Sequence, residues 1–151
     1  MQDRYAGDIG DFGKFGDVVG TVEDIGMRST RIRTLSRTLV SIPNSTFAGA
    51  NLENYSVRDK ILFNPTFQVK RNTPDEEVWH LMDAMKRVLE KHGSVEPAPT
   101  PVRVTAMTAA AFQMEIFSYV LTPDIDEFYK IQSELLLAIN EAFESAHLEL
   151  V

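Results

Sequence analysis

Apolar residues recur every three or four positions in two stretches of the second half of the chain, and this spacing predicts two amphipathic helices. In the first helix the apolar positions are Val78, Leu81, Met82, Met85, Val88 and Leu89. In the second helix they are Phe128, Ile131, Leu135, Ile139 and Phe143. The sequence Thr-Pro-Asp opens both helices, at 73–75 and at 122–124. Thr73 is the predicted N-cap of the first, and Glu76 is placed to complete a capping box with it.

Apolar and polar residues alternate in three other stretches of the second half, as in strands with one buried face. A strand over 61–70 is interrupted at Pro65, where we expect a bulge or a sheet edge. Residues 102–106 and 112–116 form a predicted hairpin. The order strand, helix, strand, strand, helix predicts a ferredoxin-like α/β sandwich over residues 61–151. Only 148–151 remain for a last strand, which we therefore expect to be truncated.

Shorter strands with tight connections dominate the first half. They are predicted at 17–23, 27–34, 38–42 and 51–55, with a short strand around 8–12 and a helical turn at 45–49. Gly20 lies inside the strand 17–23, where a missing side chain usually marks a bulge or a bend. These features predict a small, strongly curved β-barrel over residues 1–60, too small to bury much surface alone. The predicted fold class is therefore mixed β and α+β.

Composition and charge narrow the classes of function. The 151 residues are 44% hydrophobic and 25% charged, which is a globular composition. The formal net charge of -7 disfavours a nucleic-acid or anionic-membrane binder, because such proteins need a basic footprint. The absence of Cys excludes disulfides and Cys-based metal sites. No apolar run approaches the roughly 20 residues that span a bilayer, so we expect this polypeptide to be soluble.

No catalytic, metal-binding or cofactor-binding constellation is predicted. The histidines His80, His92 and His147 are too widely spaced to form a ligand pair. The acidic clusters at 75–77 and 124–127 fall in first helical turns, where carboxylates complement the helix dipole. The glycines between 7 and 16 lack the Gly-Lys-Ser/Thr of a phosphate loop. We therefore expect no enzyme activity and no cofactor.

One local basic cluster consists of Arg28, Arg31, Arg33 and Arg37. Arg31 and Arg33 alternate onto the same face of a predicted strand. One functional interpretation is an RNA-binding face, and another is an electropositive rim that faces lipid headgroups and ions. A third is pairing with acids such as Glu23 and Asp24, within the barrel or between subunits. Pairing is favoured, because the chain is acidic and no aromatic residues interleave the cluster for base stacking.

Several short motifs in the first 45 residues together resemble the β-domain of the small-conductance mechanosensitive channel (MscS) family. They are Gly7-Asp8, Gly20-Thr21-Val22-Glu23, Ile25-Gly26, Arg28-Ser29-Thr30-Arg31-Ile32-Arg33-Thr34 and Ile42-Pro43-Asn44-Ser45. Each motif alone is weak, but all of them occur in the order of the family pattern. Beyond residue 61 the resemblance is architectural. The turn at Ser36-Arg37 departs from the acid-Gly pair that is common in the family.

The resemblance implies a function and an assembly. In the family, membrane helices precede the β-domain, and seven subunits form a ring with a hollow cytoplasmic vestibule that has side openings. The chain is then expected to be the soluble vestibule portion of a channel in the inner membrane of a bacterium. It would be a structural, ion-admitting homo-oligomer that contributes to ion flux and osmotic-pressure release, joined to the membrane through helices absent from this sequence.

The resemblance also suggests site residues. The candidates for a subunit interface or a membrane-proximal surface are Arg28, Arg31 and Arg33. The candidates that flank the loop at a side opening are Lys70, Arg71, Asp75 and Glu76. This loop is expected to be exposed to solvent. The alternatives from other classes are an Sm-like nucleic-acid binding module on the first half and a small hydrolase on the second, the latter resting on fold analogy alone.

Overall fold

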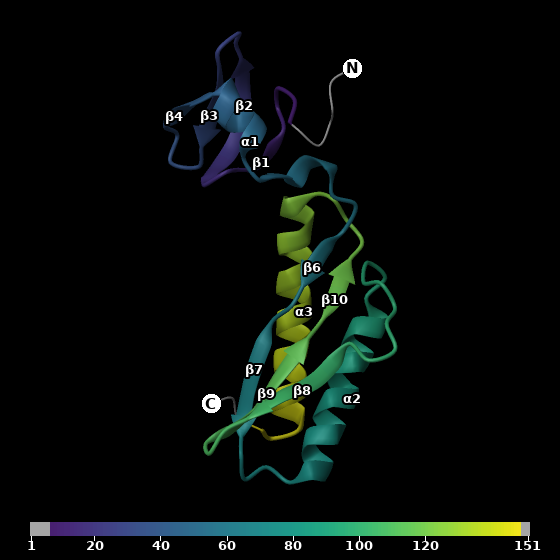
Figure 1. Ribbon diagram of the computed structural model, residues 1–151. Helices are drawn as coiled ribbons and strands as arrows, with labels where there is room; N and C mark the ends of the chain where they lie inside the picture. Colours follow the sequence, from purple (N-terminus) through teal and green to yellow (C-terminus); the bar gives the residue numbers. More distant parts are fainter. Residues whose placement is uncertain (1–6, 149–151) are drawn as a thin grey trace. The chain divides into compact units, whose positions relative to one another are not determined.

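The computed structural model of the protein describes residues 7–148. The chain divides into two compact units, the first ending at Arg58 and the second beginning at Asp59. The first is built mainly from strands, and the second combines strands with two long helices (Figure 1).

The first unit is an antiparallel sheet of five strands in the order β4-β3-β2-β1-β5. The strands are β1 (Phe12–Phe15), β2 (Val18–Ile25), β3 (Ser29–Thr34), β4 (Leu39–Pro43) and β5 (Leu52–Asn54). A short helix α1 (Asn44–Gly49) precedes β5, and a 3-10 helix η2 (Tyr55–Val57) follows it. No pairing joins the edge strands β4 and β5 within residues 7–148, so the sheet is not closed there and the predicted small barrel is not confirmed. The three residues of β5 pair only with β1.

Two local predictions for the first unit were wrong. The short strand expected around 8–12 begins only at Phe12, because residues 8–11 form a turn in which the Asp8 amide donates to Asp11 Oδ2 (2.9 Å). The bulge lies between Val22 and Asp24 and not at Gly20. Gly20 instead allows close strand pairing, since a Cβ there would lie 2.4 Å from the Arg33 carbonyl oxygen.

The core of the first unit is small. Its fully buried apolar residues are Phe15, Val22 and Ile32. Partly buried residues from β2, β4, α1 and β5 cover them, among them Phe47, whose ring stacks on Phe15 at 5.6 Å between centroids. Such a core removes little apolar surface from water, so hydrogen bonds carry a larger share of the specificity of this unit.

The second unit packs two helices against antiparallel strands. The strands are β6 (Ile61–Phe63), β7 (Thr66–Lys70), β8 (Val102–Met107), β9 (Ala111–Ile116) and β10 (Ser118–Val120). The helices are α2 (Asp75–Lys91) and α3 (Ile125–Ser145). Strands β7, β9 and β8 form one sheet in that order, and β10 pairs with β6 in another. The α+β organisation is confirmed, whereas a complete ferredoxin-like sandwich is not. Most of the predicted last strand, 148–151, lies outside the described residues.

The predicted strand over 61–70 is two strands in two different sheets. The break falls at Asn64 and Pro65, and Pro65 has no N–H to donate to a ladder. Here the Asn64 side chain donates to the Ile116 carbonyl (2.6 Å), and the Ile116 amide donates to the Pro65 carbonyl (3.0 Å). The chain therefore changes sheets at this point. The three-residue strand β10 was not predicted at all.

The helix starts differ from each other and from the prediction. The N-cap of α2 is Pro74, no side chain caps it, and Thr73 is buried, so the predicted capping box is absent. The N-cap of α3 is Asp124, whose carboxylate accepts from the Asp126 amide (3.0 Å). Thr122 adds a bond to the Glu127 carboxylate (3.0 Å). The repeated Thr-Pro-Asp sequence therefore uses two different capping arrangements.

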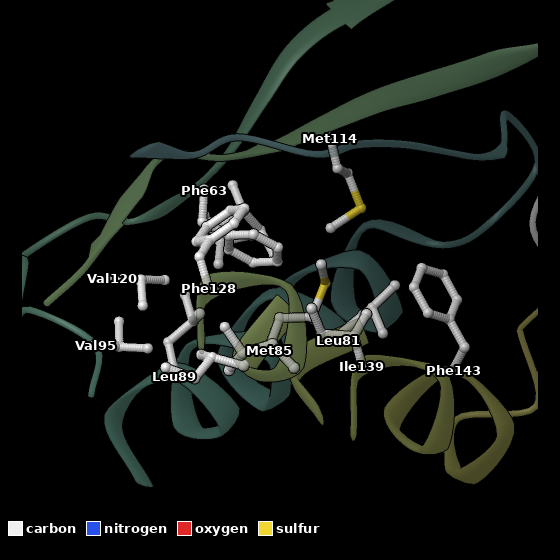
Figure 2. Packing of buried hydrophobic residues seen from close by; sticks show 14 of the residues in the cluster. Phe63, Leu81, Met85, Leu89, Val95, Met114, Val120, Phe128, Ile139 and Phe143 are labelled. Atoms are coloured by element: carbon white, nitrogen blue, oxygen red, sulfur yellow. The ribbon is translucent and has the colours of Figure 1, made fainter. Parts of the chain in front are cut away.

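The core of the second unit lies between the helices and the strands. Figure 2 shows side chains of α2 and α3, such as Leu81, Met85 and Ile139, gathered on the same side of Met114 from β9. The predicted inward faces of both helices are confirmed: Val78, Leu81, Met85 and Leu89 are buried in α2, and Phe128, Ile131, Leu135, Ile139 and Phe143 in α3.

Candidate functional site

Residues from separate motifs meet at the turn between β2 and β3. The side-chain amide of Asn44 donates to the Gly26 carbonyl (2.9 Å), and its oxygen accepts from the Thr30 hydroxyl (2.8 Å). The Asn44 backbone amide donates to the Arg28 carbonyl (2.8 Å), and the Gly26 amide to that of Ser29 (2.8 Å). The residues Gly26, Thr30 and Asn44 of separate motifs thus fix one turn.

The fixed turn presents Met27 and Arg28 to solvent. Met27 is fully exposed, and Arg28 is exposed as well. The Arg28 side chain makes no hydrogen bond or ion pair with residues 7–148, and the same holds for Arg31 on β3. Arg31 lies opposite Asp24 on β2 and Ser41 on β4. Both side chains are therefore available to a partner.

Arg33 is different, because it is paired within the first unit. Its Nε and Nη2 donate to the two carboxylate oxygens of Glu23 (2.8 and 2.9 Å), and Nη1 donates to the Arg37 carbonyl (3.1 Å). The hydrogen bond from Arg33 is the main cause that lowers the pKa of Glu23, and the same bond raises the pKa of Arg33. The predicted pairing of the basic cluster with Glu23 is confirmed at this residue. The negative charge of Glu23 therefore offsets one of the four positive charges of the cluster.

The residues predicted at the side-opening loop lie between β7 and α2. Arg71 is exposed, donates to the Thr108 carbonyl (2.8 Å) and stacks on the Phe112 ring (5.6 Å to the centroid). Lys70 ends β7, and Asp75 and Glu76 occupy the exposed first turn of α2. The expected solvent exposure is confirmed for all four residues. Their role at an opening stays a prediction.

The described residues offer no metal site, since no group of three or more His, Asp or Glu side chains converges among residues 7–148. His92 caps α2, where its Nδ1 accepts from the Ser94 amide (3.2 Å). Its Nε2 then donates to Glu134 of α3 (2.8 Å), so the ring joins the two helices. Among the described helices none is long and apolar enough to cross a membrane.

An apolar groove beside α2 was missed by the sequence analysis. It has a volume of about 500 Å³ and is lined by Val78, Trp79 and Met82 of α2, by residues 99–104 and by Phe112. Trp79 is 65% exposed, because it points away from the core-facing stripe of its helix. A tryptophan outside a predicted core stripe is the one sequence signal that would have indicated this surface.

Two family descriptions match consecutive parts of the chain. Residues 5–57 match "Mechanosensitive ion channel, beta-domain", and residues 63–150 match "Mechanosensitive ion channel MscS, C-terminal".

Curated relatives match over nearly the whole chain. It is 32% identical over 142 residues to the small-conductance mechanosensitive channel MscMJ of Methanocaldococcus jannaschii, covering 94% of this chain and 40% of that protein. It is 28% identical over 144 residues to the large-conductance channel MscMJLR of the same organism, covering 93% and 40%. The chain thus spans about two fifths of the length of these relatives.

Solved structures show the same fold at low sequence identity. Arabidopsis thaliana MSL1 superposes with a TM-score of 0.86 at 20% identity, over 95% of this chain and 52% of that one. Helicobacter pylori MscS in its closed state gives a TM-score of 0.74 at 20% identity, over 95% and 55%. With the fold and the sequence matches in agreement, this chain belongs to the MscS family of mechanosensitive ion channels.

Proposed function

We propose that this chain forms the vestibule portion of an MscS-type mechanosensitive channel, with a structural, ion-admitting role and no catalysis. The observation that carries the proposal is the succession of both family matches along one chain. The parent channel lies in the inner membrane of a bacterium, with this portion on the cytoplasmic side. Its activity is passage of ions under membrane tension, which relieves osmotic pressure.

The proposal includes assembly into a homo-oligomer, a heptamer as in the family. It is supported by the two edges β4 and β5 of the first sheet, which pair with no further strand among residues 7–148 and whose backbone groups favour such pairing. The small core of Phe15, Val22 and Ile32 is a second support, because association adds buried surface. Arg28 and Arg31 contribute at the subunit interface or near the membrane, whereas Arg33 is already paired with Glu23 across β3 and β2.

We place the side openings of the vestibule beside Lys70, Arg71, Asp75 and Glu76, which are exposed. Both signs of charge occur there, so these residues define no selectivity by themselves. We also place the boundary between two domains, a β-domain and an α/β domain, near residue 60. The division of the chain into two compact units between Arg58 and Asp59 supports this boundary.

The test is a survival and patch-clamp assay of the gene that encodes this chain. The host is a bacterium deprived of its own mechanosensitive channels, and the matched control is the same gene without residues 7–148. We expect survival of osmotic downshock and tension-activated currents only with the intact gene. Intact protein that reaches the membrane but conducts no current under tension contradicts the proposal. Steeply salt-dependent RNA binding by the chain would instead favour the nucleic-acid module.

A further inference from the structure

Within the second unit, one flank along α2 and β8 is an apolar surface that none of its described residues covers. Strand β8 is an edge of its sheet, and its apolar residues Val104 (42%) and Met107 (60%) are exposed. Trp79 of α2 is exposed beside Val104 in the groove of about 500 Å³. Exposed edge strands with apolar side chains are normally covered by another element or another chain. This groove flank therefore has the character of an interface.

The opposite flank carries an uncharged stripe on α3. Its members are Tyr129, Gln132, Ser133, Leu136 and Asn140, which share one face at 3.6 residues per turn. Tyr129 is 55% and Leu136 is 36% exposed. Most other exposed residues of α3 are charged, including Lys130, Glu141 and Glu144, so the stripe differs from the rest of the helix surface.

The stripe and the groove lie on opposite sides of the unit. A second pocket, distinct from the Trp79 groove, lies between α2 and α3, and Ala138, Ala142 and Ser145 of α3 line it. The stripe lies about half a turn around α3 from these three residues, on the side of the helix away from α2. Phe143, next to the stripe, contacts Phe67 of β7 (6.0 Å between centroids). Strand β7 is the sheet edge opposite β8, and Figure 1 shows α2 on the β8 side.

Charge favours contact between these two flanks. Copies of a chain with net charge -7 repel one another over most of their surface. The groove lining holds two acids and two bases, Asp75 and Asp83 with Lys86 and Arg103, and the five stripe residues carry no charge. Lys86 and Arg103 also pair with Glu90 and Glu115. On these surfaces two copies meet less like-charge repulsion than a uniformly acidic surface would give, and both contain large exposed apolar side chains.

We propose that the Trp79 groove of one copy receives the Leu136 stripe of the next copy. Because the two surfaces differ and lie on opposite flanks, the contact is heterologous, and repetition of it generates a ring when the rotation closes. The inference rests on the proposed ring of subunits and adds the contact made by the second unit. Trp79 and Tyr129 are its aromatic anchors.

Cysteine cross-linking tests the contact directly, because the native chain has no Cys. The Val104→Cys and Leu136→Cys variants are prepared separately, mixed and oxidised. We expect a covalent dimer from the mixture and none from either variant alone. The matched control replaces Leu136→Cys by Leu137→Cys, at a neighbouring residue that is more exposed (67%) but lies off the stripe. That mixture should give little product.

Trp79, the only tryptophan, provides a second measurement. Its emission should shift to shorter wavelength as the concentration of the chain rises and the groove is covered. Leu136→Glu should weaken association about tenfold or more, since a buried charge is placed in the contact. Leu137→Glu should leave association unchanged.

Several results would overturn the proposal. Cross-linking of Val104→Cys with itself would indicate a symmetric contact instead. Equal yields from Leu136→Cys and Leu137→Cys would indicate nonspecific collision. A chain that stays monomeric with unchanged Trp79 emission up to about 1 mM would also contradict it. The channel assay distinguishes failure of this contact from failure of the proposed function. If a Leu136→Glu channel keeps its native size and its tension-activated currents, the vestibule function stands and the contact is contradicted.

Discussion

The two units of this protein are stabilised in different ways. The first has three fully buried apolar residues in its core cluster, and its turns are fixed by side-chain hydrogen bonds such as those of Asn44. The second has sixteen buried residues in its core cluster, drawn from both helices, from all five strands and, at Val95, from the segment between α2 and β8. Cohesion in the first unit depends on particular polar atoms, and in the second on apolar volume.

This difference explains how the family resemblance is distributed along the chain. A hydrogen-bonded turn needs specific residues, so the first unit carries literal motifs such as Ile-Pro-Asn-Ser. A large apolar core accepts many combinations of residues of similar volume, so the second unit keeps only its pattern of apolar positions. The first unit is therefore recognised by its motifs, and the second by the spacing of its apolar residues.

The largest effect is expected from a cavity in the core of the second unit. Leu135→Ala removes a side chain that is 1% exposed and should lower the free energy of unfolding by about 2–5 kcal/mol. Urea unfolding followed by Trp79 emission measures this unit. Leu137→Ala, at a 67% exposed position, is the control and should change little. Equal effects of the two substitutions would contradict the assigned packing of α3.

A smaller effect is expected from the loss of the fixed turn in the first unit. Asn44→Ala removes bonds to Gly26 and Thr30 and should destabilise this unit by about 1–2 kcal/mol. Hydrogen exchange of the β2 and β3 amides should accelerate, while that of α3 stays unchanged. Asn51→Ala is the control, since its side chain makes no hydrogen bond with residues 7–148. Unchanged exchange at β2 and β3 would show that the turn does not depend on Asn44.

The smallest effect concerns the Arg33–Glu23 pair, which is exposed and screened by salt. The folded-state pKa of Glu23 lies below its usual value of 4.5, chiefly because Arg33 donates to it. Its stabilisation is therefore present above that value and is lost as the pH falls through the folded-state pKa.

Glu23→Gln should consequently lower the urea midpoint of the first unit slightly at about pH 7 and hardly at all at about pH 3. Asp24→Asn, at the adjacent residue without a side-chain bond to residues 7–148, is the control. A difference between wild type and Glu23→Gln that grows in acid would contradict the assigned pair.

The sequence by itself determined the elements whose signals are local. Helical periodicity indicated α2 and α3 and their buried faces, and alternation indicated the hairpin of β8 and β9. The motif residues identified the β-domain of the family. Periodicity and alternation can be recognised in the sequence because the residues of each helix or strand alone decide which of its faces is apolar.

The tertiary structure alone decided the features that depend on residues far apart in the chain. Only strand pairing shows that Gly20 must admit the Arg33 carbonyl, that Arg33 is the member of the basic cluster that pairs with Glu23, and that Asn44 reaches back to Gly26. The same is true of the two separate sheets on either side of the expected break at Pro65 and of the residues from β8 and β9 that line the groove beside Trp79. Such features were not predictable from spacing, because a hydrogen bond or a surface depends on atoms that only folding brings together.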